Sequence, residues 1–204
     1  MSLQDKSVVV TGGSRGLGSG LVETLVDLGA KVTVVARQSE ALEAVRNQLG
    51  VGTLAADVRD GAAAHRILAE VRPDILVLNA GAKPPMAKLD QISWAYFTAL
   101  WEHDVKAVLH WLQAALNLPL ASGSRVLVVS SGAAVGGSPM SGGYGGAKRR
   151  PLRSVTLPAT VRMMASFGRG NSAANDGAAN FAQNRISTRP LRAWSRERSP
   201  MAAE

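Results

Sequence analysis

Residues 11–18 read TGGSRGLG, a glycine-rich stretch between the apolar run of residues 8–10 and a segment with helical periodicity. Glycine adopts positive φ readily and has no Cβ, so its backbone can approach a pyrophosphate closely. The N-terminus of the helix that follows offers unpaired N–H groups and the positive end of a dipole. A strand, a glycine-rich turn and a helix in this order indicate a nucleotide-binding βα unit, with an ordinary tight βα turn as the alternative.

The composition predicts one globular domain. The chain has 204 residues, of which 46% are hydrophobic, and it has no cysteine. This length is enough for one core, and no apolar run approaches membrane-spanning length. The missing cysteines exclude disulfides, thiolate nucleophiles and cysteine-based metal sites. Residues 1–6 lack a signal-peptide pattern, and His65, His103 and His110 lack a metal-ligand spacing. We therefore expect a cytoplasmic enzyme without a metal.

Positive charge is concentrated in the last quarter of the chain. Residues 1–148 contain 13 Lys and Arg against 12 Asp and Glu, whereas residues 149–204 contain 10 Arg against 3 acids. The net charge is therefore +1 in the first part and +7 in the second. Disordered arginine-rich segments can bind nucleic-acid phosphates. This segment has no dense basic cluster, and its aromatic residues are Phe167, Phe181 and Trp194. We expect no nucleic-acid partner, with an arginine-rich binding tail as the alternative.

Apolar segments alternate with helical patterns along the first 148 residues. The expected strands are residues 7–13, 31–37, 53–58, 75–78 and 125–130. The expected helices begin near Leu17, cover residues 39–49, 59–71 and about 93–118, and start again at Tyr144. Nearly all-apolar strands that alternate with helices belong to a parallel sheet covered on both faces, and right-handed crossovers make it doubly wound. The predicted fold class is α/β, a Rossmann-like doubly wound parallel sheet that is truncated after the fifth strand.

Polar residues gather where these strands end. In a doubly wound sheet, ligands bind beyond the carboxyl ends of the strands, at the switch in strand order. The glycine-rich turn, Asp57, Asn79 and Ser131 all stand at such ends. The sequence therefore predicts one functional rim.

Four motifs together resemble the short-chain dehydrogenase/reductase family: Thr11-Gly12-x-x-x-Gly16-x-Gly18, Asn79-Ala80-Gly81, Ser131, and Tyr144-x-x-x-Lys148. The step of thirteen residues from Ser131 to Tyr144 is similar to the family's usual spacing. The resemblance covers residues 5–148. It implies an oxidoreductase that transfers hydride between a nicotinamide cofactor and a small carbonyl or alcohol substrate. It also implies a homodimer or homotetramer packed through the long helices.

The acid/base chemistry follows from the residue types. Reduction of a carbonyl needs an acid that protonates the developing alkoxide, and a free tyrosine, with a pKa of about 10, is a poor one. Lys148 shares a helical face with Tyr144, and a nearby ammonium favours the phenolate. Ser131 can hold the substrate oxygen by a hydrogen bond. We therefore predict Tyr144 as acid/base, Lys148 as its electrostatic partner and Ser131 as carbonyl holder. The resemblance adds a contact between Lys148 and the nicotinamide ribose.

The cofactor preference is predicted from two arginines. An NAD-binding unit usually has an acid at the end of its second strand, where this chain has Ala36-Arg37, and Arg15 lies in the glycine-rich turn. Two guanidiniums can clamp a 2′-phosphate, so we expect NADP(H) rather than NAD(H), with two solvated arginines as the alternative. By resemblance, Asp57 lies near the adenine and Asn79 braces the central strands. The predicted cofactor-binding residues are Thr11, Gly12, Ser14, Arg15, Gly16, Leu17, Gly18, Arg37, Asp57, Val58, Asn79, Ala80, Gly81, Tyr144 and Lys148.

The chain departs from the family at Asp104. Counting 27 residues back from Ser131 gives Asp104 where the family usually has an asparagine that completes a Ser-Tyr-Lys tetrad. The family's residue holds a relay water through its main-chain carbonyl, so an aspartate can serve. Its carboxylate can instead disturb the helix and the charge near Lys148. Asp104 is therefore the fourth catalytic candidate.

A second departure follows Lys148. Arg149-Arg150-Pro151 breaks the helix, and residues 152–204 contain no pattern of a buried strand. We therefore expect a cofactor-binding and catalytic domain at residues 1–148 and an aberrant, poorly ordered, arginine-rich segment at residues 149–204. A frameshift would explain the change in composition. The alternative function is a catalytically defective nucleotide-binding product of a frameshifted or truncated reading frame.

Overall fold

The computed structural model describes residues 2–149, except residues 85, 89, 119 and 139, and the backbone of Arg162–Gly168. Its strands are β1 (Ser7–Thr11), β2 (Lys31–Ala36), β3 (Gly52–Ala55), β4 (Ile75–Leu78), β5 (Arg125–Ser131) and β6 (Arg162–Gly168). Its helices are α1 (Leu17–Asp27), α2 (Ser39–Leu49), α3 (Gly61–Val71), α4 (Trp94–Leu100), the π-helical η1 (Trp101–Val105), α5 (Lys106–Asn117), α6 (Ala133–Gly136) and α7 (Gly142–Arg149). None of the helices in these residues is both long and apolar enough to cross a membrane.

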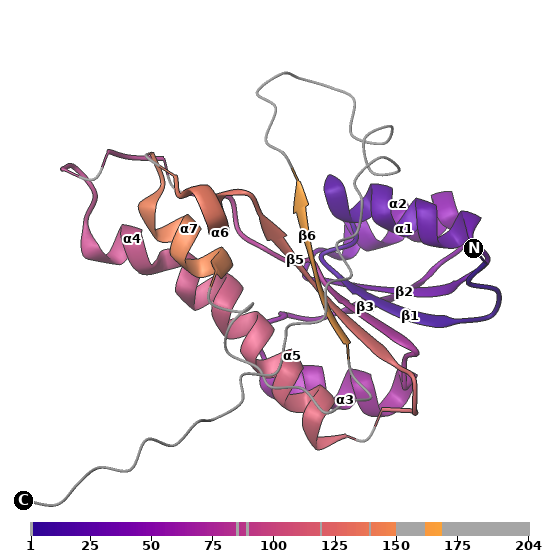
Figure 1. Ribbon diagram of the computed structural model, residues 1–204. Helices are drawn as coiled ribbons and strands as arrows, with labels where there is room; N and C mark the ends of the chain where they lie inside the picture. The colour runs from indigo at the N-terminus through magenta and orange to yellow at the C-terminus, as the bar shows by residue number, and fades with distance from the viewer. Residues whose placement is uncertain are drawn as a thin grey trace, which may run out of the picture.

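The strands form one parallel sheet in the order β3-β2-β1-β4-β5-β6. The chain moves outward from β1 to β3 and then crosses back to β4 on the other side of β1. Figure 1 shows α1 and α2 on one face of this sheet and α3 and α5 on the other. The doubly wound α/β class predicted from the sequence is confirmed. The switch in strand order lies between β1 and β4.

Two apolar clusters hold the helices to the sheet. Val9 packs in the cluster that includes Trp111 of α5, whereas Val8 and Val10 pack in the cluster that includes Val22 of α1. This division follows the two-residue period of a strand, which points successive side chains to opposite faces. Complete burial of a valine side chain stabilises a fold by about 1.5–3 kcal/mol, so the central strand contributes to both cores. The carboxyl end of β1 is thereby fixed from both faces.

Several element boundaries differ from those expected, and the strand expected at residues 7–13 ends at Thr11. The strand expected at residues 53–58 ends at Ala55, and the next helix begins at Gly61 because the side chain of Asp60 accepts a hydrogen bond from the N–H of Ala62. The expected helix over residues 93–118 is instead α4, η1 and α5 in succession. π-Helical turns of this kind often occur at functional sites. Here the widened turn contains Asp104.

The sheet has one strand more than the sequence predicted. Arg162–Gly168 pairs in parallel with the whole of β5, from Arg125 opposite Arg162 to Ser131 opposite Gly168. The expectation of truncation after the fifth strand is therefore wrong for this segment. The physical reason is that the open edge of β5 presents unpaired N–H and C=O groups, with which an extended segment can pair through its backbone alone. Residues 150–161 and 169–204, where a poorly ordered segment was expected, lie outside the described residues.

Candidate active site

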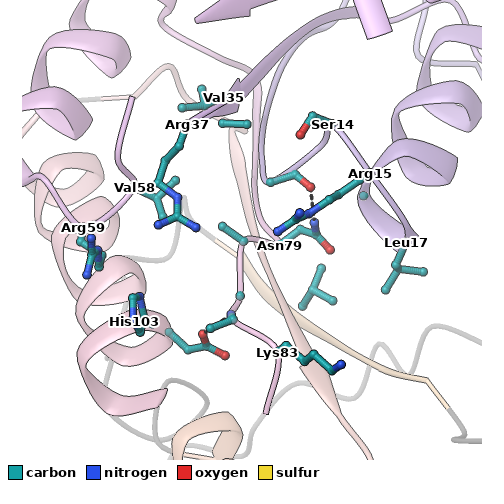
Figure 2. A pocket seen from close by; sticks show the side chains of 18 of the residues that line it. Ser14, Arg15, Leu17, Val35, Arg37, Val58, Arg59, Asn79, Lys83 and His103 are labelled. Carbon is teal, nitrogen blue, oxygen red and sulfur yellow. Dashed lines mark hydrogen bonds between the residues drawn. The ribbon is translucent and has the colours of Figure 1, made fainter. Parts of the chain in front are cut away.

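A cleft of about 530 Å³ opens beyond the carboxyl ends of the strands, at the switch in strand order (Figure 2). Its lining residues come from the turn after β1, the end of β2, the loops after β3 and β4, η1, β5 and α7. They are Gly12, Ser14, Arg15, Leu17, Gly18, Val35, Ala36, Arg37, Gln38, Asp57, Val58, Arg59, Asn79, Ala80, Gly81, Ala82, Lys83, His103, Asp104, Val129, Ser130, Tyr144 and Lys148. The glycine-rich turn, Asp57 and Asn79 of the predicted rim thus line one concave site, and Ser131 is not among the lining residues.

The glycine-rich turn brings α1 unusually close to β1. Gly12 and Gly16 have φ values of +68° and +56°, which favour glycine. A Cβ on Gly18 would lie 2.1 Å from the carbonyl oxygen of Gly12 and 2.6 Å from Nδ2 of Asn79. A Cβ on Gly16 would meet no atom within 4 Å, so that side of the turn is open. Among the described residues, no side chain accepts a capping hydrogen bond from the N–H groups at the start of α1, which leaves the first of these groups available to a ligand.

Thr11 and Asn79 tie the turn to the neighbouring strand. Oγ1 of Thr11 accepts hydrogen bonds from the N–H groups of Asn79 (3.1 Å) and Ala80 (3.2 Å). The side-chain amide of Asn79 donates to the carbonyls of Thr11 (3.3 Å) and Gly12 (3.1 Å). Thr11 is only 2% exposed. Thr11 therefore stabilises the wall of the cleft through the backbone of Asn79 and Ala80. Neither Thr11 nor Gly16 is among the described residues that line the cleft.

Tyr144, Lys148 and Asp104 form a compact group at the other end of the cleft. Nζ of Lys148 lies 5.6 Å from the centre of the Tyr144 ring and 2.8 Å from Oδ2 of Asp104. Oδ1 of Asp104 accepts a hydrogen bond of 2.8 Å from the N–H of Ala82. Oδ2 accepts no aligned hydrogen bond from the described residues, so its contact with Lys148 is an ion pair between poorly aligned groups. Asp104 is 3% exposed, so the positive charge of Lys148 has a fixed, buried counter-charge.

Gly81 makes room for this ion pair. A Cβ on Gly81 would lie 3.1 Å from Nζ of Lys148 and 3.2 Å from Oδ2 of Asp104. The π-helical turn η1 presents Asp104 to the loop after β4, where the N–H of Ala82 binds it. Three segments thus meet at one point: η1 with Asp104, α7 with Lys148, and the loop after β4 with the N–H of Ala82.

Ser131 lies at the end of β5, beside the cleft wall. Its Oγ accepts a hydrogen bond of 3.3 Å from the N–H of Ala133, at the start of α6. This bond uses the oxygen, and the hydroxyl proton makes no hydrogen bond with the residues that the structure describes, so it can be donated. Among the described residues it is the neighbouring Ser130 that lines the cleft, and Oγ of Ser130 donates to the carbonyl of Lys148 (2.9 Å). Ser130 therefore fastens α7 to β5.

The comparisons with known proteins agree with this geometry. The family model described as "short chain dehydrogenase" matches residues 6–150. The chain belongs to the short-chain dehydrogenase family. The family named from the sequence motifs is thereby confirmed, and the match ends close to the boundary at which the composition changes.

Several characterised dehydrogenases are similar to this family member. Short chain dehydrogenase/reductase AacuD of Aspergillus aculeatus is 34% identical over 152 residues, which cover 70% of this chain and 54% of AacuD. Sorbitol dehydrogenase of Cereibacter sphaeroides is 30% identical over 80% of this chain and 67% of its own. The structure of a short chain dehydrogenase/reductase family protein superposes with a TM-score of 0.67 and 27% identity, over 74% of this chain and 65% of that one. The chain spans between about half and two thirds of the length of these relatives.

The short-chain dehydrogenase site contains polar side chains that the motifs did not identify. Arg59, Lys83 and His103 line the cleft, and all three lie next to residues that the motifs did identify. Arg59 follows Asp57 by two residues, and this spacing was the available signal for it. Lys83 follows the Asn79-Ala80-Gly81 motif, and His103 precedes Asp104. Among the described residues no group of three or more His, Asp or Glu could hold a metal ion.

Asp57 and Arg59 form a second ion pair on the short-chain dehydrogenase rim. Nη2 of Arg59 lies 2.6 Å from Oδ2 of Asp57, and Nε lies 3.0 and 3.1 Å from the two carboxylate oxygens. The hydrogen bonds from the Arg59 guanidinium hold the pKa of the Asp57 carboxyl well below its ordinary value. Asp57 is therefore ionised at neutral pH.

Proposed function

We propose that this protein transfers hydride between NADP(H) and a carbonyl or alcohol substrate, with Tyr144 as the acid/base. The observation that carries the proposal is that one cleft contains both the glycine-rich turn and the Tyr144–Lys148 pair. A dinucleotide that occupies the cleft would extend from the turn to the tyrosine. This is the arrangement that nicotinamide chemistry requires, because the reacting ring must meet an acid/base group.

The residues present fit a dinucleotide. The missing Cβ at Gly18 lets α1 approach the turn, and the unpaired N–H groups at the start of α1 suit a pyrophosphate. When bound, the nicotinamide would supply or accept the hydride. The residues that we assign to binding of the dinucleotide are Gly12, Ser14, Arg15, Leu17, Gly18, Val58, Ala80 and Gly81. Thr11 and Gly16 shape the glycine-rich turn.

The charge of the cleft supports a phosphorylated cofactor. Its two acidic side chains are both paired, Asp57 with Arg59 and Asp104 with Lys148. The other three basic side chains of the lining, Arg15, Arg37 and Lys83, form no ion pair with the described residues. Figure 2 shows Arg15 and Arg37 reaching toward the cleft from different walls. An excess of positive charge in a concave site favours a polyanionic ligand, and NADP(H) carries one phosphate more than NAD(H).

Two relatives support the same preference by their names. NADPH-dependent pterin aldehyde reductase of Arabidopsis thaliana is 33% identical over 62% of this chain. NADP-dependent 3-hydroxy acid dehydrogenase YdfG of Salmonella typhi is 29% identical over 69% of this chain. Both act with the phosphorylated cofactor that we propose here.

The chain's own residues provide the proton chemistry. In reduction, the O–H of Tyr144 donates its proton to the substrate oxygen as negative charge develops there, and in oxidation the phenolate takes the proton back. The ammonium of Lys148, 5.6 Å from the tyrosine ring, stabilises that phenolate. Asp104 keeps the ammonium in place through the ion pair. The free hydroxyl proton of Ser131 can be donated to the same substrate oxygen.

Assembly and location stay predictions. Four large apolar side chains are exposed on α4 and α5: Trp94 at 77%, Tyr96 at 48%, Leu109 at 50% and Leu116 at 44%. They support a homodimer or homotetramer packed through these helices. We also propose the cytoplasmic location that the composition predicts.

Turnover tests the proposal directly. The purified full chain should oxidise NADPH in the presence of at least one member of a panel of small aldehydes and ketones, measured by the loss of nicotinamide absorbance. The reason for this expectation is that one cleft contains both a turn suited to a dinucleotide and a tyrosine suited to act as an acid. Tight NADPH binding without turnover of any aldehyde, ketone or alcohol would contradict the enzymatic role.

A second candidate function is a nucleotide-binding product without catalysis. The observation that favours it is the end of the family match at residue 150, two residues after Lys148. We propose that residues 149–204 are a separate arginine-rich segment that arose by a shift of reading frame. Translation of the coding DNA in its other two frames after codon 148 tests this. One frame should continue the family match, and the hypothesis is wrong if neither does.

A further inference from the structure

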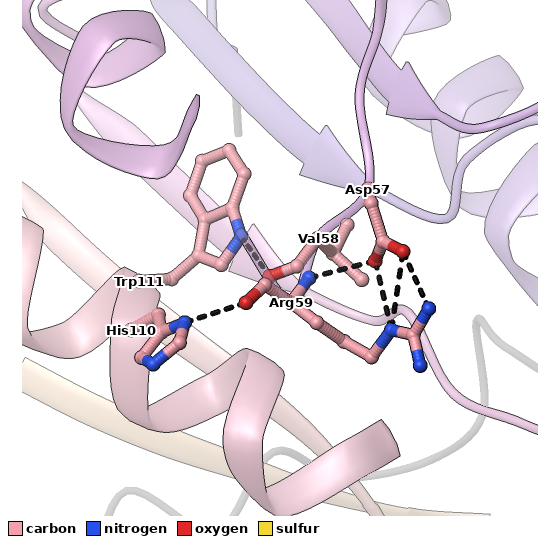
Figure 3. A network of polar contacts seen from close by, with 5 residues as sticks. All are labelled: Asp57, Val58, Arg59, His110 and Trp111. Carbon is pink, nitrogen blue, oxygen red and sulfur yellow. Dashed lines mark hydrogen bonds and ion pairs between the residues drawn. The ribbon is translucent and has the colours of Figure 1, made fainter. Parts of the chain in front are cut away.

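The Asp57 carboxylate accepts its hydrogen bonds from Arg59 in the described part of the chain (Figure 3). Its Nε contacts both oxygens and its Nη2 contacts Oδ2 at 2.6 Å. Its backbone N–H also donates to Oδ1 at 2.9 Å. All four hydrogen bonds to this carboxylate thus come from one residue, two positions along the chain. A planar guanidinium suits this forked contact, which a lysine cannot reproduce.

Arg37 stands within the electrostatic reach of the same carboxylate. Its positive charge contributes to the lowered pKa of Asp57, after the larger effect of Arg59. Nevertheless, Arg37 makes no ion pair with Asp57 or with any other acid among the described residues. Both arginines and the aspartate line the cleft. If Arg59 did not occupy Asp57, Arg37 would be a cation of the same cleft that could pair with it.

We infer that Arg59 is a specificity-determining residue, which binds Asp57 and thereby leaves Arg37 available for the 2′-phosphate of NADP(H). The inference rests on the proposed cofactor. Without Arg59, the free carboxylate captures Arg37, and the affinity for NADPH falls. NADH has no 2′-phosphate, so its affinity changes little. The charge pattern of the loop after β3 therefore sets the cofactor preference, together with the arginine at the end of β2.

The loop that carries Asp57 and Arg59 is held by its backbone, independently of the Arg59 side chain. Nε1 of Trp111 donates to the carbonyl of Val58 at 3.0 Å, and Nδ1 of His110 lies 2.7 Å from the carbonyl of Arg59. A carbonyl oxygen only accepts, so Nδ1 of His110 carries the proton. Both side chains come from α5, and Trp111 is 1% exposed. Truncation of Arg59 at Cβ should therefore leave the path of the loop unchanged.

The test compares NADPH and NADH affinities of the full chain by nicotinamide fluorescence. We expect Arg59→Ala to weaken NADPH binding about tenfold while NADH binding changes less than about twofold. The double variant Arg59→Ala/Asp57→Asn should recover the ratio of NADPH affinity to NADH affinity to within about threefold of the unchanged chain, because no carboxylate remains to capture Arg37. The ratio is the quantity compared because the loss of a contact between Asp57 and the adenine would weaken both cofactors alike. In an Arg37→Ala background, Arg59→Ala should cause no further loss of NADPH affinity.

Three results would overturn the inference. They are an equal loss of affinity for both cofactors, no recovery in the double variant, and a further NADPH-specific loss in the Arg37→Ala background. The last would mean that Asp57 repels the phosphate directly rather than through Arg37. A failure of the proposed function has a different signature in the unchanged chain, which would then bind neither dinucleotide or would bind NADPH without turnover.

Discussion

Tyr144→Phe should lower kcat for NADPH-dependent carbonyl reduction by a factor of about 10²–10⁴, the usual contribution of a positioned acid/base group. The variant lacks only the O–H that would protonate the substrate oxygen. The phenylalanine ring keeps the contact with Lys148, whose Nζ lies 5.6 Å from the ring centre. The dissociation constant of NADPH should therefore change by less than about threefold. Steady-state kinetics and a fluorescence titration on the same preparation measure both quantities.

The second tyrosine of the chain provides a matched control. Tyr96 lies on α4, is 48% exposed and does not line the cleft. Tyr96→Phe removes the same hydroxyl from a different place and should leave kcat within about twofold of the unchanged chain. If Tyr144→Phe retained full activity, or if both variants lost it equally, Tyr144 would not be the acid/base.

Gly18→Ala should nearly abolish NADPH binding and lower the free energy of unfolding by about 1–3 kcal/mol, the range for inserting a methyl group into a packed site. The new Cβ would lie 2.1 Å from the carbonyl oxygen of Gly12 and 2.6 Å from Nδ2 of Asn79, far inside contact distance. Helix α1 would have to move away from the turn, and its N–H groups would move with it. Denaturant unfolding and NADPH titration measure the two effects.

Gly20→Ala is the control for the same substitution. Gly20 lies in α1 two residues further on, and a Cβ there would meet no atom within 4 Å. Because alanine favours a helix over glycine by about 1 kcal/mol, this variant should unfold at a higher denaturant concentration and bind NADPH normally. Similar behaviour of the two variants would show that the close approach at Gly18 is unimportant.

The fold class was predictable because it depends on local patterns. Apolar strands alternate with amphipathic helices, and this order alone implies a parallel, doubly wound sheet with its ligand site at the strand ends. Arg15, Asp57 and Asn79 were placed on one rim by this argument, and they line one cleft. The sixth strand was not predictable in the same way. Backbone pairing with the β5 edge requires no apolar pattern in Arg162–Gly168.

The interactions between the site residues were less predictable than the identities of those residues. The motifs identified Lys148 and Asp104 separately, but their ion pair joins residues 44 positions apart and depends on the π-helical turn η1, which no sequence pattern indicated. Thr11 appeared to be a ligand contact because it begins the motif, whereas its hydroxyl binds the backbone of Asn79 and Ala80. Side-chain hydrogen bonds between distant segments decide such roles, and a linear motif does not encode them.

Titration of the purified full chain with NADPH, followed by nicotinamide fluorescence with NADH in parallel, tests the central claim most directly. The account predicts saturable binding at one site per chain, with a lower dissociation constant for NADPH than for NADH. That result would support both the dinucleotide cleft and the arginines that select the phosphate. Absence of saturable binding by either dinucleotide, in a chain shown to be folded by its cooperative unfolding, would contradict it.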